Sequence, residues 1–322
     1  MSPEVVPVTG PLLEQILDAT HPIWGEGLSR QAYGRYNAAQ LRTAWATDHL
    51  RRVALVDNGR LLATAKCYDL RARVDGRPVP VLGLGAVFTP LGLRRRGHAS
   101  ELLGRLMSAA AAEGARFAML FSEIAPAFYR RLGLAIVPVD QVLVEVDRRP
   151  GAPAMPLRSG EKKDAPAIAA MHAARSAPYR FALERTPERV LYAMTKKRLL
   201  AGLGPPGAKV VDFFVAEEGG QAAAYVVILR SGGAWTVSEC GDRDPSGARV
   251  GALLQGLLAR TPGAPLPSIR SWLPSGFVPP QVRLVRHERP PVALMLGPIG
   301  TTPPIDPPLQ LGDAMYWHAD AF

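Results

Sequence analysis

The stretch from Val87 to Ser100 combines positive charge with small side chains, in a pattern that suits phosphate binding. Three consecutive arginines begin at Arg94, and the small residues Gly97 and Ala99 follow them. Small side chains let backbone N–H groups approach a ligand closely. Where a helix begins, those groups and the helix dipole favour anions. The stretch therefore predicts a pyrophosphate site, although Gly-x-Ala beside arginines also occurs in plain strand–helix connections.

The residues around this stretch predict an α/β sheet in which a helix follows the third strand of a meander. Apolar residues at helical spacing indicate the helices, and Asn58-Gly59 indicates a tight hairpin turn because such residues accept positive φ. In chain order we expect helices over 12–17 and 30–46, strands over 52–56, 61–70 and 79–88, a helix over 102–114, a strand over 117–121, a short helix over 126–132 and a strand over 134–146.

The second half of the chain predicts a weaker copy of the same order. Residues 148–153, rich in Arg, Pro and Gly, form a linker by composition. We therefore predict two domains, over residues 1–147 and 154–322. In the second domain we expect helices over 164–174 and 187–200, strands over 210–217, 222–229 and 234–240, a helix over 250–259, and short strands over 268–273 and 292–296.

Two spaced motifs in the first half resemble those of the GNAT acetyltransferase superfamily. Arg94-x-x-Gly97-x-Ala99 resembles that family's Arg/Gln-x-x-Gly-x-Gly/Ala motif. A segment similar to the family's Phe-Tyr-x-x-x-Gly-Phe follows, and it reads Phe128-Tyr129-Arg130-Arg131-Leu132-Gly133-Leu134. Residues 120–134 are particularly similar to fungal lysine acetyltransferase-type members. Two motifs that fit together are more specific than one glycine pattern.

The resemblance implies a GNAT fold, a mixed and mostly antiparallel sheet flanked by helices, followed by a second, degenerate GNAT-like domain. It also implies acetyl-CoA as cosubstrate. The residues that it assigns to coenzyme binding are Val87, Phe88, Arg94, Arg95, Arg96, Gly97, His98, Ala99, Ser100 and Ser122. In the second domain the corresponding stretch carries Asp242 and Asp244, whose charge repels a pyrophosphate. We therefore expect one coenzyme site per chain.

In this family the acetyl group passes directly to an amine in a ternary complex, so the amine must lose a proton and the thiolate must gain one. Tyr129 matches the family tyrosine that protonates the coenzyme A sulfur; the alternative is a packing residue. Glu123 is the first candidate base, with a solvated loop carboxylate as the alternative. A carboxylate of the tail, from Asp320 or from the terminus at Phe322, is another candidate, since a chain terminus enters the active site in some two-domain relatives. The alternative is that the tail aromatics merely anchor the chain end.

The acceptor that we expect is a primary amine of a small molecule or a peptide. Trp24 and Tyr36 lie in the first helical region, which lines the acceptor pocket in the family, although both also fit plain core or surface positions. The expected function is N-acetyl transfer from acetyl-CoA. The alternative is a non-catalytic acyl-CoA-binding or regulatory protein that kept the loop and lost turnover.

Composition and charge limit the partners, the location and the metal content that we expect of this protein. The net charge of +10 comes from scattered residues apart from the arginine triplet, so we expect no nucleic-acid partner. No apolar run is long enough to span a bilayer, and the first residues do not resemble a signal peptide. The two cysteines have no metal-ligand spacing. We expect a soluble cytoplasmic protein with no metal and no membrane partner, either a monomer or a homodimer.

Overall fold

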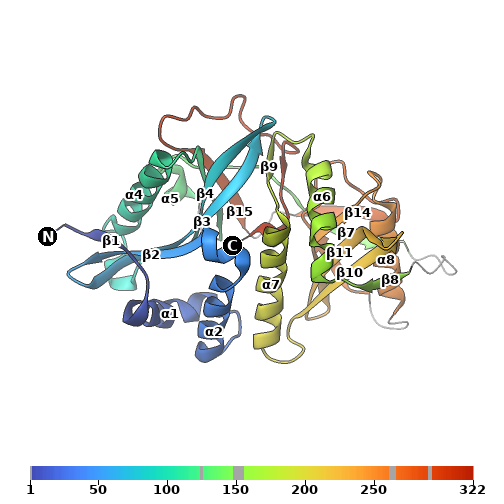
Figure 1. The fold of residues 1–322 in the computed structure, drawn as a ribbon, viewed down its shortest axis with the longest axis horizontal. Helices are drawn as coiled ribbons and strands as arrows, with labels where there is room; N and C mark the ends of the chain where they lie inside the picture. The colour runs from blue at the N-terminus through green and yellow to red at the C-terminus, as the bar shows by residue number, and fades with distance from the viewer. Residues whose placement is uncertain (1, 124–125, 148–155, 261–265, 289–291, 322) are drawn as a thin grey trace. The chain divides into compact units, whose positions relative to one another are not determined.

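The computed structural model describes residues 2–123, 126–147, 156–260, 266–288 and 292–321, and these form two compact units (Figure 1). Unit 1 comprises Met1–Pro138 and Pro291–Gln310. Unit 2 comprises Val139–Pro290 and Leu311–Ala321. Each unit is a mixed sheet flanked by helices, which confirms the expected fold class.

The sheet of unit 1 is a meander that continues into a parallel pair. In sheet order its strands are β1 (Glu4–Pro7), β2 (Leu50–Asp57), β3 (Arg60–Val74), β4 (Arg77–Phe88), β5 (Phe117–Ser122), β15 (Ala293–Pro298) and β6 (Ala135–Ile136). Only β4 and β5 pair in parallel, and the other neighbours are antiparallel. The predicted hairpin turn is confirmed, because Asn58 and Gly59 both have positive φ, of 48° and 76°.

Helices cover both faces of this sheet. They are α1 (Gly10–Trp24), α2 (Arg30–Leu41), α3 (Ala44–His49), α4 (His98–Ala112) and α5 (Ala127–Arg130), with a 3₁₀-helix η1 (Leu91–Leu93). Successive strand residues point to opposite faces. Accordingly Leu55 of β2 packs in one core with Leu102 of α4, and Ala54 packs in another with Ile16 of α1. The helix expected over 30–46 is divided, because Thr43 starts α3 and its hydroxyl accepts from the N–H of Ala46.

The sheet of unit 2 repeats this plan with a parallel pair between β12 and β13. In sheet order its strands are β14 (Val282–Glu288), β7 (Gln141–Val146), β13 (Ser268–Ser271), β12 (Ala234–Asp242), β11 (Gln221–Ser231), β10 (Val210–Glu218) and β8 (Leu157–Ser159). Unit 2 also contains a parallel pair of short strands outside this seven-stranded sheet, β9 (Phe181–Leu183) and β16 (Ala314–Met315). The helices are α6 (Ala165–Ser176), α7 (Pro187–Leu203) and α8 (Ala248–Ala259), with 3₁₀-helices η2 (Lys162–Asp164) and η3 (His318–Asp320).

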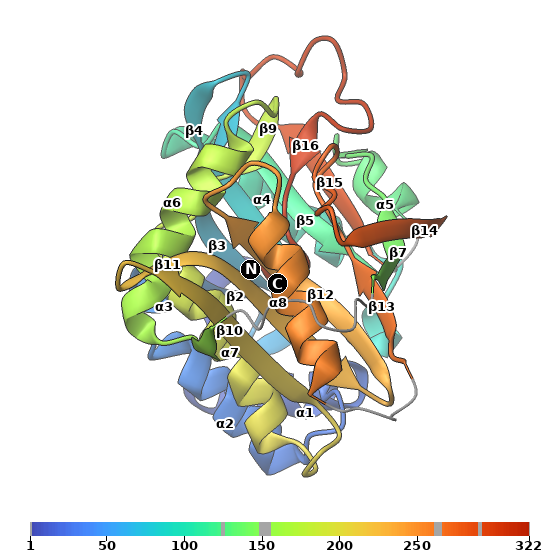
Figure 2. The same cartoon turned by 90° about the vertical axis from the view of Figure 1, so that its right-hand side faces the viewer.

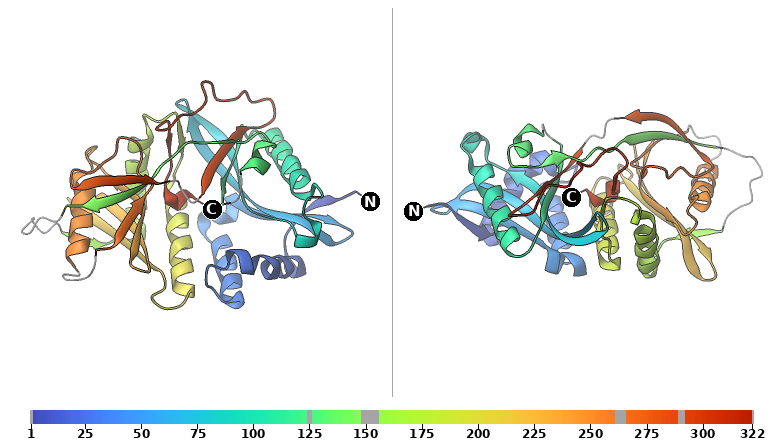
Figure 3. Two further views of the ribbon diagram at one scale, coloured as in Figure 1. Left: turned by 180° about the vertical axis from the view of Figure 1, so that it is seen from behind. Right: turned by 90° about the horizontal axis from the view of Figure 1, so that it is seen from above.

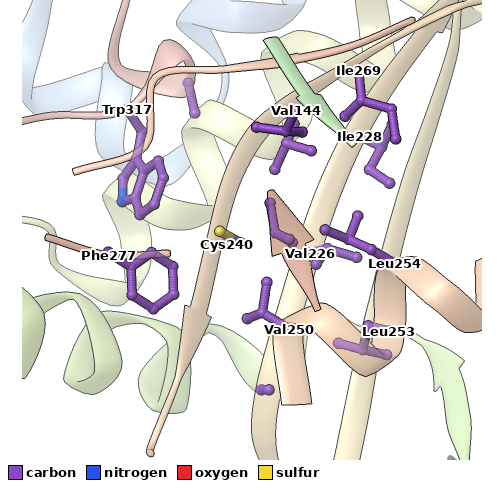
Figure 4. Packing of buried hydrophobic residues seen from close by; sticks show 14 of the residues in the cluster. Val144, Val226, Ile228, Cys240, Val250, Leu253, Leu254, Ile269, Phe277 and Trp317 are labelled. Atoms are coloured by element: carbon purple, nitrogen blue, oxygen red, sulfur yellow. The ribbon is translucent and has the colours of Figure 1, made fainter. Parts of the chain in front are cut away.

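In unit 2 the central strand β11 is buried on both faces. Val226 packs with Leu254 of α8 on one face (Figure 4), and Val227 packs with Ile168 of α6 and Val190 of α7 on the other. The ribbon views show α8 on one side of the strands and α6 and α7 on the other (Figures 2 and 3). No helix among the described residues is long and apolar enough to cross a membrane.

One strand of the first half of the chain belongs to the sheet of unit 2, and one strand of the second half belongs to the sheet of unit 1. The strand expected over 134–146 is divided at Pro138, which has no N–H to donate. Its first part, β6, stays in the sheet of unit 1, and β7 joins the sheet of unit 2. In return β15, which we expected in the second domain, lies between β5 and β6. The domain division expected at residues 147 and 154 therefore differs from the compact units in these segments; the linker over 148–153 lies outside the described residues.

Candidate functional site

The predicted phosphate loop connects the end of β4 to the start of α4 in unit 1. The chain runs from Phe88 through η1, and the last loop residue is Gly97, with φ of 87°. Glycine adopts that conformation without the strain that a Cβ imposes. The first hydrogen bond of α4 runs from the N–H of Glu101 to the carbonyl of Gly97 at 2.9 Å. The N–H groups of residues 98–100 precede that bond, and no side chain caps the helix.

Positive charge surrounds these N–H groups. Arg94, Arg95 and Arg96 are exposed, and within the described part of the chain none of them forms an ion pair with a carboxylate. Arg94 donates only to the carbonyl of Thr89, at 3.3 Å. A Cβ built on Gly97 meets no heavy atom within 4 Å, so the loop faces open space. The residues present therefore fit a pyrophosphate, which needs donors, positive charge and close access to the backbone.

The strands β4 and β5 part next to this loop. Their parallel register ends at the pair Leu84↔Leu120, whereas β4 continues to Phe88 and β5 to Ser122. A bulge bends β4 at this point, because β3 places one residue opposite two of β4, and Ala86 has a φ of 47°. The last residues of β4 therefore present backbone groups beside β5 that an extended ligand with amides can bind.

Tyr129 lies on α5, which follows β5. Its ring is buried in the core formed by α4, β4 and β5, and it stands edge-on to Phe128 with centroids 4.9 Å apart. The hydroxyl forms no hydrogen bond with any residue that the structure describes. Burial raises the pKa of Tyr129, so the phenol holds its proton at neutral pH.

The two residues expected at the end of β5 differ in exposure. Ser122 is buried and lies opposite Ala293 of β15 in the antiparallel register. Glu123 follows directly and is exposed, and among the described residues its carboxylate has no ion-pair partner. A free carboxylate at a strand end can accept a proton from a bound amine. Cys67 is a core residue, since it is fully buried and burial raises its pKa to about 12.

The two candidate substrate residues lie on different helices. Trp24 ends α1, and its ring meets that of Phe88 edge-on with centroids 6.5 Å apart. This contact brings an aromatic side chain to the end of β4, next to the bulge. Tyr36 is half-buried on α2, and its carbonyl accepts from the amide of Gln40 at 3.4 Å.

Unit 2 has a related strand–loop–helix connection in which the protein supplies its own anion. Gly247 precedes α8 with φ of 73° and again provides no cap. Asp242, at the end of β12, accepts from the backbone N–H of Arg249 at 2.8 Å and from that of Asp244 at 2.9 Å. Asp244 in turn accepts from the N–H of Ser246 at 2.9 Å. A carboxylate thus accepts from the first turn of α8, whereas no described side chain caps α4.

The tail docks into unit 2 through its aromatic residues and one carboxylate. Tyr316 and Trp317 are buried, and Asp320 lies 3.6 Å from Arg185 and 3.4 Å from Arg189. Burial opposes ionisation of Asp320, but the two guanidinium groups outweigh it and hold its pKa below the ordinary value. Asp320 is therefore an ion-pair partner rather than a free base. The proposed base Phe322 lies outside the described residues.

Sequence reasoning missed two features of the site. The bulge at Ala86 has no side-chain signature, because its contribution is made by backbone groups. The internal anion at Asp242 was foreseen only as a repulsive charge; the hydrogen bond to Arg249 depends on a turn that the sequence does not specify. Among the described residues, no group of three or more side chains comes together in a way that could hold a metal ion.

Comparisons with known proteins agree with this architecture. Residues 26–137 match the family model described as an acetyltransferase (GNAT) domain. No curated protein matches the sequence significantly. A protein of Enterococcus faecalis, described as a probable N-acyltransferase, has a similar fold with a TM-score of 0.66 at 13% identity, over 92% of this chain and 72% of that one.

Two further solved structures share the fold. A GCN5-related N-acetyltransferase from Kribbella flavida has a TM-score of 0.63 at 18% identity, over 92% of this chain and 71% of that one. A tandem GNAT protein from the clavulanic acid biosynthesis pathway has a TM-score of 0.54 at 14% identity, over 94% of this chain and 100% of that one. At these identities the likeness concerns the fold, and it extends over both units.

Proposed function

We propose that this protein transfers an acetyl group from acetyl-CoA to a primary amine, because residues 26–137 match the GNAT domain model and the fold is that of GNAT structures. Family and fold support acyl transfer in general. The observation that carries the specific proposal is the uncapped start of α4 beside the opening between β4 and β5. This arrangement offers one site for a pyrophosphate and an adjoining one for an extended chain with amides.

In the proposed complex, coenzyme A supplies the activated thioester. The protein binds the pyrophosphate of the coenzyme at one place and the amides of its pantetheine arm at another. The N–H groups of residues 98–100 bind the pyrophosphate, and Arg94, Arg95 and Arg96 balance its charge. Backbone groups of Ala86 and Val87, beside the bulge, bind the amides of the pantetheine arm. The arm therefore lies along β4, and its sulfur end points toward α5.

Tyr129 acts as the general acid. Its hydroxyl lies in a mostly apolar core and has no hydrogen-bond partner among the described residues, so its proton is available to a sulfur that gains charge. The raised pKa keeps the phenol protonated at neutral pH. Loss of this proton donor raises the barrier to release of the thiolate.

The acceptor amine approaches from the side of Trp24 and Glu123. Trp24 stands against Phe88 and forms an apolar wall at the end of β4. Glu123, exposed and free of described ion-pair partners, takes the proton of the amine directly or through water. Tyr36 contributes to the acceptor side from α2, and the carboxylate of Phe322 is a second candidate base.

A thiol-release assay tests the proposal. The full chain is incubated with acetyl-, propionyl- and longer acyl-CoA and with a panel of small amines and peptides carrying a free N-terminus or lysine. We expect free thiol to appear with acetyl-CoA only when an accepted amine is present, and the Gly97→Val variant to release it more slowly at subsaturating acetyl-CoA. Tight binding of acetyl-CoA without release against any amine would instead favour a non-catalytic acyl-CoA-binding protein.

A further inference from the structure

A cavity separate from the coenzyme site lies within unit 1. Its volume is about 320 Å³, at the lower end of the range for small-molecule sites. The walls come from Val8, which follows β1, and from α1, α2, β2 and β3, and half of the lining residues are apolar. The apolar lining residues are Val8, Leu13, Leu17, Ala38, Leu41 and Leu50.

This cavity lies on the face of the sheet opposite the phosphate loop. Arg52 lines the cavity and lies two residues before Ala54 in β2, so both side chains are on the same face of the sheet. Ala54 packs against α1 on that face. Leu55 of the same strand packs against α4, whose first turn forms the phosphate loop. None of the residues assigned to coenzyme binding lines the cavity.

The most unusual feature of this cavity is a buried arginine, Arg52, that forms no ion pair with a carboxylate of the described residues. Arg52 is only 8% exposed. Its Nη2 donates to the side-chain oxygen of Asn37 at 3.1 Å, whereas Nη1 has no hydrogen-bond partner among the described residues. Burial lowers the pKa of Arg52, and the groups that oppose this effect are the phenols of Tyr33 and Tyr68 rather than carboxylates.

The other charged residues around the cavity add to its positive character. Lys66 lies opposite Arg52 in the β2–β3 register, and Arg35 lines the cavity from α2. The one carboxylate of the lining, Glu14, is held by Arg30 at 2.7 Å. A buried charge without a partner is strongly unfavourable, so an arginine in this position needs either an anion or a reason to be retained without one.

We propose that this cavity binds a small organic carboxylate, whose anionic group pairs with Arg52 and whose apolar body lies against α1 and α2. The carboxylate supplies the acceptor that Nη1 lacks, and it neutralises the buried guanidinium. A body of a few carbons matches the leucine and valine walls. The site needs neither the coenzyme nor the acceptor amine, so it stands independently of the proposed acetyl transfer.

Calorimetry on the full chain without coenzyme tests the proposal. The probes are straight-chain carboxylates of two to eight carbons and, as neutral matches, the corresponding amides. We expect saturable binding of at least one carboxylate at one site per chain, and no binding of its amide. Absence of binding across the whole series, or equal binding of the amide, overturns the proposal.

The variant Arg52→Met keeps the length of the side chain and removes the charge. We expect it to weaken carboxylate binding at least tenfold, whereas Arg42→Met, at the exposed end of α2, leaves binding unchanged. Without carboxylate the melting temperature of Arg52→Met should equal or exceed that of the parent, because an unpaired buried charge is removed. A melting temperature well below the parent's, with binding retained, would make Arg52 a purely structural residue.

A second variant decides the matter if Arg52→Met does not fold. Ala38 lines the cavity from an exposed position on α2, so Ala38→Trp fills the space without disturbing Arg52. Loss of carboxylate binding with an unchanged circular dichroism spectrum supports the site. Retention of full binding in this folded variant overturns it. Acetyl-CoA binding, measured in parallel, should be the same in all variants, which separates this proposal from the proposed acetyl transfer.

Discussion

The carboxylate of Asp242 accepts the backbone N–H of Arg249 at 2.8 Å, within the first turn of α8. The same carboxylate also accepts a hydrogen bond from Nη1 of Arg249 at 3.0 Å. In unit 1 no described side chain accepts from the first turn of α4 in this way, and the arginines before it are exposed. The start of α8 in unit 2 is thus capped by a carboxylate of the protein, whereas the start of α4 in unit 1 is available to an anionic ligand.

We therefore expect one coenzyme site per chain. Calorimetry with acetyl-CoA should give a stoichiometry of one, because Asp242 uses the donors at α8. The Asp242→Ala variant should lose about 1–2 kcal/mol of unfolding free energy, the scale of a lost helix cap. A stoichiometry of two in the parent chain would contradict this interpretation of unit 2.

Gly97→Val should raise the dissociation constant of acetyl-CoA at least tenfold, about 1.4 kcal/mol. Valine at φ of 87° is strained, and its side chain stands in the space that a pyrophosphate would enter. Gly92→Val is the matched control, since Gly92 lies in the same loop, faces open space and has no positive φ. Equal affinities in the two folded variants would remove the loop from the site.

Tyr129→Phe should lower kcat by about 100-fold and leave coenzyme affinity almost unchanged, because only the proton donor is lost. The acid must be protonated to act, and burial raises the pKa of Tyr129. Deprotonation of Tyr129 should therefore cause no loss of kcat in the parent enzyme below about pH 10, the ordinary value for tyrosine. A variant with the parent's kcat would make Tyr129 a packing residue.

The motifs could be recognised from the sequence because their function depends on local geometry. Gly97 at a helix start and Tyr129 on a short helix after β5 both lie in elements that the predicted pattern contained. The strand exchange could not be predicted, since the pairing of Met295 with Leu120 joins residues far apart in the chain. The position of a short strand such as β15 in a sheet depends on the strands it pairs with rather than on the residue pattern of its own sequence.

Acidification from pH 7 to pH 4 should destabilise unit 2 through His172. Burial lowers the pKa of His172 to about 4, and its Nε2 bonds to the carbonyl of Leu183 at 2.8 Å. The unfolded chain binds a proton near pH 6.5, whereas the folded chain does not, so stability is lost as the pH falls through this window. The shift corresponds to roughly 3 kcal/mol at pH 4.

Urea denaturation between pH 7 and pH 4 measures this effect. His172→Gln should flatten the dependence of the unfolding free energy on pH by that amount, whereas His98→Gln, at the start of α4, should leave it unchanged. A parallel pH dependence in His172→Gln and the parent would show that another group causes the loss.

The last prediction separates two roles of the tail. Asp320 forms ion pairs with Arg185 and Arg189 in the interior of unit 2, and Lys196 donates to the carbonyl of Ala321. Asp320→Asn should destabilise the protein by about 3–5 kcal/mol, because it removes a buried carboxylate that both Arg185 and Arg189 contact. Stability and activity should then fall together, as expected of an anchoring residue.

Two glycines added after Phe322 test the terminal carboxylate by itself. They move that carboxylate and leave the contacts of Asp320 in place. If the terminus is the base, kcat falls at least tenfold while the melting temperature stays the same, and Glu123→Gln has little effect. If Glu123 is the base, the extended chain keeps its kcat and Glu123→Gln loses it. Unchanged kcat in both variants would exclude both carboxylates as essential bases.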